Sequence, residues 1–151
     1  MLRTKIHIAI SAIGVILGIS AFICFCIVYA NIEAGIWALM SGLNAALSLM
    51  LHCHYLKQSL HVNFSRKALQ YIRDFAIVGF VSGGGLTIFY IFLECYYGLE
   101  ILPINTSIVI RLVWSFMMMK WGLLLYYTTR KYLRTYNDHQ FFSENPYIEE
   151  T

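Results

Sequence analysis

Four long runs of apolar residues make up most of the chain and constrain its fold more than any other feature. They cover residues 6–29, 35–56, 75–93 and 108–129. A helix needs roughly 20 mostly apolar residues to cross a bilayer, whereas a membrane β-barrel would show shorter segments of alternating polarity. The sequence therefore predicts an all-α membrane protein with four transmembrane helices, one bundle over residues 1–136 and a tail over 137–151.

The composition agrees with a membrane protein. Of the 151 residues, 59% are hydrophobic and 13% are charged, whereas soluble domains have about 25% charged residues. The net charge of +3 comes from residues beside the runs, so we expect the lipid bilayer as a partner and no nucleic acid. The four cysteines lie mostly within the runs and indicate neither a disulfide framework nor a zinc site.

The distribution of positive residues predicts the orientation. Nine of the 11 Lys and Arg residues precede the first run, separate the second from the third or follow the fourth: Arg3, Lys5, Lys57, Arg66, Lys67, Arg73, Arg130, Lys131 and Arg134. The segment before the fourth run carries Glu94 and Glu100, with Arg111 beyond it. Because positive residues stay preferentially in the cytosol, we expect cytosolic termini and a cytosolic tail. Asn105 then begins a glycosylation sequon on the exoplasmic side. A second sequon at Asn63 would face the cytosol, and a glycan there would contradict this orientation.

The second run contains a stripe of polar and aromatic residues. At about 100° per residue, these recur on one helical face: Trp37, Ser41, Asn44, Ser48, His52 and Tyr55. Polar groups inside a span cost free energy unless they face protein, water or a ligand. His54 lies about 200° from His52 around the helix. The pattern therefore favours His52 as the histidine that faces the bundle interior.

Lys120 lies near the middle of the fourth run, where an unpaired lysine costs about 2.5–3.5 kcal/mol. No Asp or Glu falls inside any of the four runs. One interpretation is that its ammonium group reaches the headgroups or a neighbouring carbonyl. The other is that an anionic ligand enters the bundle and supplies the missing charge. Phe116, Tyr127 and Lys131 share the face of Lys120, so this face combines aromatic and positive groups.

Haem is one ligand with the required chemistry. It is a flat, apolar macrocycle with two propionates and an iron that accepts His, Tyr, Cys or Met ligands. His52, Tyr55 and the group Cys95, Tyr96 and Tyr97 are of these types. Composition alone does not distinguish haem from a quinone, a sterol or a lipid.

Specific motifs narrow this choice. The fourth run and its continuation contain Val113-Trp114-Ser115-Phe116, Lys120-Trp121, Leu124-Leu125 and Arg130-Lys131-Tyr132. The second run adds His52 with Tyr55, and the entry to the third adds Arg73-x-Phe75 and Val78-Gly79. In these residues the chain resembles the eukaryotic haem-responsive-gene family of four-span haem transporters. The resemblance covers most of the chain and is most specific in the fourth span.

The resemblance implies a set of haem-binding residues. His52 matches the haem-ligating position of the second span, with the haem iron as its metal. Arg130, Lys131 and Tyr132 match a cytosolic aromatic-basic motif, although Thr128 and Thr129 stand where the family has an aromatic residue and an alanine. Some family members have a histidine in the second exoplasmic loop, where this chain has Cys95, Tyr96 and Tyr97. The complete predicted set is His52, Tyr55, Lys120, Arg130, Lys131, Tyr132, Cys95 and Tyr96.

The resulting expectation is a haem transporter of the plasma membrane or of endosomes and lysosomes. It would move haem from the exoplasmic or lumenal side to the cytosol, with haem as its substrate and with no permanent cofactor. No catalytic residues are expected, and a homo-oligomer is expected because four thin helices enclose little volume. Two alternatives remain open: a non-transporting membrane scaffold or chaperone, whose polar stripe only joins helices, and a transmembrane haem oxidoreductase.

Overall fold

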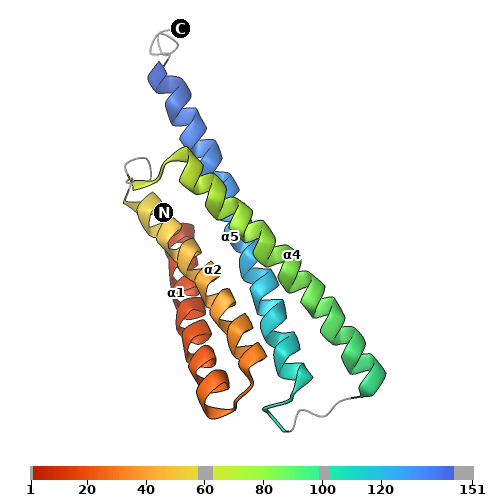
Figure 1. Cartoon of the computed structure of the whole chain (residues 1–151). Coiled ribbons are helices and arrows are strands. Elements are labelled where there is room, and N and C mark those ends of the chain that lie inside the picture. Colours follow the sequence, from red (N-terminus) through yellow and green to blue (C-terminus); the bar gives the residue numbers. More distant parts are fainter. Residues whose placement is uncertain (1, 58–62, 99–102, 145–151) are drawn as a thin grey trace.

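The computed structural model describes residues 2–57, 63–98 and 103–144, which fold into long helices. In chain order these are α1 (Leu2–Ile23), the π-helical turn η1 (Cys24–Val28), α2 (Ile32–Leu56), α4 (Arg66–Tyr97) and α5 (Ile108–Glu144) (Figure 1). Within the described residues, four segments are long and apolar enough to cross a membrane: Thr4–Val28, Ile32–Leu56, Arg66–Tyr97 and Ile108–Asn137. The prediction of an all-α protein with four transmembrane helices is confirmed.

The helices form a row in the order α1, α2, α5, α4 (Figure 1). Helix α2 packs against both α1 and α5, and α4 packs along α5. Along the helix axes, the beginning of α1 and the end of α5 lie toward the same end of the bundle, here called the terminal end (Figure 1). The opposite end, here called the hairpin end, contains the turn from η1 to α2, the end of α4 and the beginning of α5.

Burial is inverted relative to a water-soluble domain. Large apolar side chains face outward: Ile27 is 75% exposed and Ile88 is 71% exposed. Polar side chains lie inside, including Ser41, Asn44, Ser48, His52, Thr87, Ser115 and Thr129. Extensive apolar exposure is unfavourable in water but matches a hydrocarbon solvent. The polar stripe of α2 therefore faces the bundle interior, as its periodicity predicts.

Local capping explains where the helices begin and end. Asn31 caps α2 by accepting a hydrogen bond from the backbone N–H of Ala34, and Ser65 caps α4 by accepting one from Ala68. Gly98 ends α4 in the left-handed conformation with φ of 57°. Capping at Ser65 lets α4 begin before the third apolar run. Residues 137–144 of the predicted tail continue α5, while 145–151 lie outside the described residues.

Glycines bring two helix pairs into backbone contact. A Cβ atom on Gly18 of α1 would lie 2.6 Å from the Cα atom of Gly42 in α2. A Cβ atom on Gly83 of α4 would lie 2.6 Å from the backbone nitrogen of Met119 in α5. Small residues permit such close approach in a membrane, where lipid supplies no hydrophobic drive for helix association. These contacts hold the α1–α2 pair and the α4–α5 pair together.

Candidate functional site

A cavity of about 200 Å³ lies between α1, α2 and α5, in their halves nearest the terminal end. We call it the His52 cavity. Its lining residues are His7, Ile10 and Ser11 from α1, Ser48 and His52 from α2, and Trp121, Leu124, Tyr127, Thr128, Lys131 and Tyr132 from α5. Of the eight predicted haem-binding residues, this cavity brings together three: His52, Lys131 and Tyr132.

His52 is held by a short hydrogen bond to α5. The distance from its Nδ1 atom to the Tyr132 hydroxyl oxygen is 2.7 Å, and both side chains are buried. A metal-binding histidine usually donates its other ring N–H to a fixed acceptor, which sets the tautomer and the ring orientation. If Nδ1–H donates to the Tyr132 oxygen, the lone pair of Nε2 is free to bind a metal. Tyr132 therefore acts on a ligand through the imidazole that it orients.

His7 is a second histidine at the cavity, and the sequence analysis did not identify it. Its ring lies 5.4 Å from the His52 ring between centroids, with planes 15° apart. The available sequence signal was its helical spacing, because His7, Ser11 and Gly14 recur at intervals of four and three in the first apolar run. Both side chains line the cavity, although Ser11 is buried and His7 remains exposed.

Aromatic and positive groups from α5 complete the cavity wall. Trp121 and Tyr127 provide rings, and Lys131 provides an ammonium group. Tyr55 stacks on Tyr132 with ring centroids 4.6 Å apart, and the Lys131 nitrogen lies 5.7 Å from the Tyr55 ring centroid. Tyr55 is not among the residues that line the cavity, so it supports the wall from behind.

Lys120 does not line the His52 cavity. Its nitrogen lies 5.1 Å from the ring centroid of Trp121 and 4.0 Å from the sulfur of Met117. The attraction between an ammonium group and an aromatic ring is worth about 0.5–2 kcal/mol, and it offsets part of the cost of this lysine within a span. Trp121 lines the cavity, and the Lys120 nitrogen lies against the Trp121 ring. Lys120 precedes Trp121 in α5 and is therefore nearer the hairpin end.

Helical geometry separates the three residues of the predicted aromatic-basic motif. Lys131 and Tyr132 line the His52 cavity, whereas Arg130 lines a different cleft, between α4 and α5. Consecutive residues of a helix point about 100° apart, so three in a row cannot face one small site. The motif is therefore divided between two pockets, with Lys131 and Tyr132 in one and Arg130 in the other.

The other predicted residues lie at the hairpin end. Cys95 and Tyr96 are exposed on the last turn of α4, away from the His52 cavity. Asn105 is exposed in the turn that precedes α5, a position compatible with the predicted glycan. Cys95 and Tyr96 line neither the His52 cavity nor the cleft between α4 and α5.

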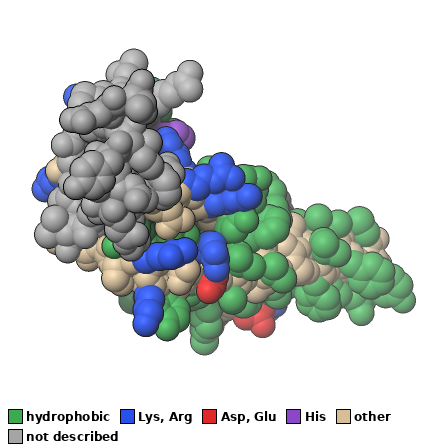
Figure 2. All heavy atoms as spheres, turned by 90° about the horizontal axis from the view of Figure 1, so that it is seen from above, with side chains coloured by type: hydrophobic (Ala, Val, Ile, Leu, Met, Phe, Trp, Pro, Cys, Tyr) green, Lys and Arg blue, Asp and Glu red, His purple; other side chains and the backbone are tan. Residues whose placement is uncertain are grey.

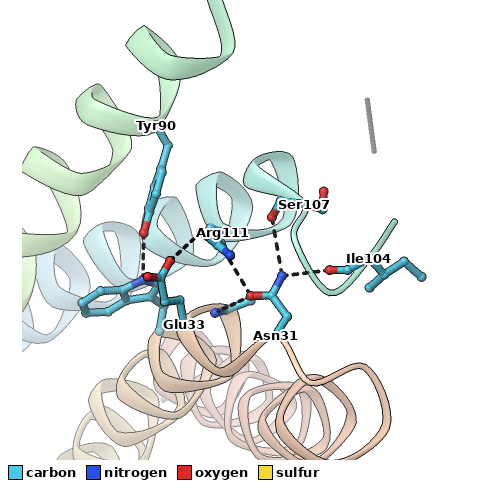
Figure 3. Close-up of polar contacts among 8 residues, drawn as sticks. Asn31, Glu33, Tyr90, Ile104, Ser107 and Arg111 are labelled. Carbon is cyan, nitrogen blue, oxygen red and sulfur yellow. Dashed lines mark hydrogen bonds and ion pairs between the residues drawn. The ribbon is translucent and has the colours of Figure 1, made fainter. Parts of the chain in front are cut away.

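A polar network joins the elements at the hairpin end (Figure 3). Asn31 donates hydrogen bonds to the backbone oxygens of Ile104 and Ser107, at 2.9 and 3.5 Å. Arg111 donates to the Asn31 amide oxygen at 3.3 Å and forms an ion pair with Glu33 at 2.8 Å. This network ties the beginning of α2 to the beginning of α5, and the sequence analysis did not predict it.

Asn44 lies between that network and the His52 cavity on the stripe of α2. Its side chain is fully buried, and neither its amide nitrogen nor its amide oxygen has a hydrogen-bond partner. A buried polar group without a partner costs about 1–3 kcal/mol. Asn44 is eight residues from His52, which corresponds to about 12 Å along the helix. This amide packs against Gly79 of α4 and does not line the His52 cavity.

The His52 cavity is small for a complete macrocycle. Pockets that enclose drug-sized ligands measure about 300–1,000 Å³, compared with about 200 Å³ here. It can receive one edge of a flat ligand, with an imidazole for a metal, an ammonium group for an anion and rings for an apolar surface. The described residues contain no group of three or more His, Cys, Asp or Glu placed to hold a bare metal ion.

No family model matches the chain, and no solved structure matches it at a significant level.

Proposed function

We propose that this chain is a membrane transporter that passes haem from the exoplasmic or endolysosomal lumenal side to the cytosol. The observation that carries the proposal is the buried imidazole of His52, which faces a cavity lined by α5 with aromatic and positive side chains. Few ligands require all three features. Haem does, because its iron accepts an imidazole, its propionates pair with a cation and its macrocycle packs on rings.

Each part of the ligand has a candidate partner. His52 binds the iron through Nε2 while Tyr132 holds its Nδ1 atom. Lys131 pairs with a propionate, and Trp121 and Tyr127 contact the macrocycle. Lys120 supplies a positive charge nearer the hairpin end, where haem enters in the proposed orientation. Haem is then a substrate that moves between these groups.

The small volume of the cavity agrees with transient binding. A transported ligand must be bound strongly enough to enter and weakly enough to leave. A site that holds only one edge of haem has fewer contacts than an enclosing pocket, and full passage requires the helices to separate. Purified protein is therefore expected to bind haem weakly and exchangeably.

A haem oxidoreductase is the second candidate, and the His7–His52 pair is the observation that favours it. Such an enzyme needs histidines on facing helices, and these two rings lie 5.4 Å apart across α1 and α2. The rings are nearly parallel and stacked, so their in-plane lone pairs do not point at one common atom between them. Haem retained stoichiometrically through extensive washing would favour the enzyme, and loss of haem on washing favours transport.

Growth of haem-auxotrophic cells at low haem tests the transport proposal, with His52→Ala and His54→Ala as a matched pair. Both variants remove one histidine from the same turn of α2, but His54 does not line the His52 cavity. We expect the wild type and His54→Ala to restore growth and His52→Ala to fail, at equal protein levels in the membrane. Growth of His52→Ala equal to that of wild type would overturn the proposal.

The same assay separates transport from a purely structural scaffold. Lys120→Arg keeps the positive charge, whereas Lys120→Met replaces it with an apolar side chain of similar length. A scaffold tolerates Met or is stabilised by it, because an ammonium group within a span is costly. If Lys120 instead lies on a path for the propionates, cells with Lys120→Met fail to grow at low haem and cells with Lys120→Arg still grow.

A further inference from the structure

A second cleft, of about 410 Å³, lies between α4 and α5 at the terminal end. We call it the basic cleft. Helix α4 contributes Arg66, Gln70 and Arg73, whose spacing of four and three residues places them on one face. Helix α5 contributes Arg130 and Arg134, which are four residues apart, and a ring from Tyr126. Two arginine-bearing faces therefore meet across one cleft.

The charge of the basic cleft is poorly balanced by protein. Asp74 forms an ion pair with Arg73 at 2.8 Å, and none of the described side chains that line the cleft is Asp or Glu. Among these described side chains, four arginines and this one carboxylate give a net charge of +3. Positive groups that face one another across a contact repel, and a shared anion relieves that repulsion. The cleft is thus built to bind an anion with several negative charges.

The position of the cleft indicates where that anion comes from. The third apolar run begins at Phe75 and the fourth ends at Thr129, so the arginines lie at the polar edge of both spans. That edge corresponds to the headgroup layer of a bilayer. Seen from above, Lys and Arg side chains gather at this end of the molecule (Figure 2). Phospholipid phosphates are concentrated at this level.

We propose that the basic cleft binds the headgroup of an anionic phospholipid that carries a phosphomonoester in addition to its phosphodiester. A phosphodiester has one negative charge, and a phosphomonoester adds about 1.5–2 at pH 7. The sum is close to the +3 of the cleft. Guanidinium groups donate paired hydrogen bonds to phosphate oxygens, which suits arginine better than lysine for this role.

This site is independent of the proposed haem path. Arg130 lines the basic cleft, whereas its neighbours Lys131 and Tyr132 line the His52 cavity. The two sites therefore share α5 but use different faces of it. A variant of the basic cleft leaves the His52 hydrogen bond to Tyr132 in place, so lipid binding and haem-dependent growth are separate measurements.

Lipid titration of the purified full-length chain in phosphatidylcholine nanodiscs tests the proposal. The probes are short-chain phosphatidylinositol monophosphate, the soluble inositol bisphosphate that corresponds to its headgroup, and short-chain phosphatidylserine at matched total charge. The test variant is Arg66→Gln with Arg134→Gln, because both arginines line the cleft and neither belongs to the predicted haem-binding set. The control is Lys57→Gln with Lys67→Gln, which removes the same charge from exposed residues that do not line the cleft. Equal thermal unfolding of both variants establishes that both are folded.

We expect phosphatidylinositol monophosphate to bind at least about tenfold more tightly than phosphatidylserine, and the arginine variant to lose at least about tenfold in affinity. The lysine control is expected to stay near the wild-type affinity. Tighter binding of the lipid than of inositol bisphosphate assigns the site to the membrane, and equal binding overturns the lipid assignment in favour of a soluble phosphate anion. Equal losses of affinity in both variants, or equal affinity for phosphatidylserine, would mean that the cleft attracts negative charge without specificity. Either result would overturn the proposal.

Discussion

Tyr132 links the fourth span to the imidazole of His52 and determines which ring nitrogen is available to a ligand. Its hydroxyl group lies 2.7 Å from Nδ1, and its ring stacks on Tyr55 at 4.6 Å between centroids. The stacking fixes the ring, and the fixed hydroxyl group fixes the imidazole. At the scale of single residues, the orientation of the His52 ring therefore depends on a tyrosine of another helix.

Replacement of Tyr132 by phenylalanine tests the contribution of its hydroxyl group alone. Tyr132→Phe keeps the ring that packs on Tyr55 but removes the partner of Nδ1. Loss of such a supporting hydrogen bond typically costs about 10–100-fold in metal affinity, so we expect haem binding about tenfold weaker and an altered absorption spectrum of the bound iron. Tyr126→Phe is the control, because Tyr126 lies on the same helix but lines the basic cleft. Unchanged affinity in Tyr132→Phe would exclude a positioning role.

Sequence periodicity predicts part of this residue-level picture. The inward face of α2 follows from intervals of three and four, and Ser41, Asn44 and His52 are buried as that spacing requires. The pairing of His52 with His7 and Tyr132 does not follow, because it depends on which helices are neighbours. Lys120 illustrates the same point: its apolar surroundings were evident, but its contact with Trp121 depends on side-chain conformation.

At the scale of elements, glycine determines how closely α4 and α5 approach. The two helices meet where Gly83 faces the backbone of α5, with Ser115 and Met119 on the other side. Thr87 and Ser115 add a hydrogen bond at 3.2 Å within the same contact. Hydropathy predicts that these spans exist, but it does not predict their partners. Hydropathy also does not give the first residue of α4, because the Ser65 cap lies outside the apolar run.

A pair of alanine substitutions in α4 tests this contact. A Cβ atom at position 83 would lie 2.6 Å from the Met119 nitrogen, whereas one at position 85 would meet nothing within 4 Å. We expect Gly83→Ala to lower the free energy of unfolding by about 1–3 kcal/mol, since overpacking moves backbone. Gly85→Ala is expected to raise it by about 0.5–1 kcal/mol, because alanine favours the helix. Thermal unfolding in detergent measures both, and equal effects would contradict a close α4–α5 contact.

At the scale of the whole molecule, the two ends of the bundle differ in character. The hairpin end is closed by the Asn31, Glu33 and Arg111 network (Figure 3). The terminal end carries the basic cleft and is the end nearer the His52 cavity. Positive residues favour the cytosolic side of a membrane. This asymmetry suits release of an anionic ligand at the terminal end, provided that this end faces the cytosol.

Thiol labelling tests that orientation. One variant retains Cys95 alone, which is exposed at the hairpin end, with Cys24, Cys26 and Cys53 replaced by serine. The other carries Lys57→Cys at the terminal end in a chain without its natural cysteines. After selective permeabilisation of the plasma membrane, an impermeant maleimide is expected to label Lys57→Cys, because positive-inside orientation exposes this end to the cytosol.

Cys95 then reports the membrane as well as the orientation. In a plasma-membrane protein it reacts on intact cells, because the hairpin end faces outward. In an endolysosomal protein it reacts only after complete solubilisation, because that end faces the lumen. Labelling of Lys57→Cys on intact cells would show that the terminal end faces outward, which is the opposite of the predicted orientation. The basic cleft would then face away from the cytosol, and the proposed direction of haem transfer would be wrong even if His52 bound haem.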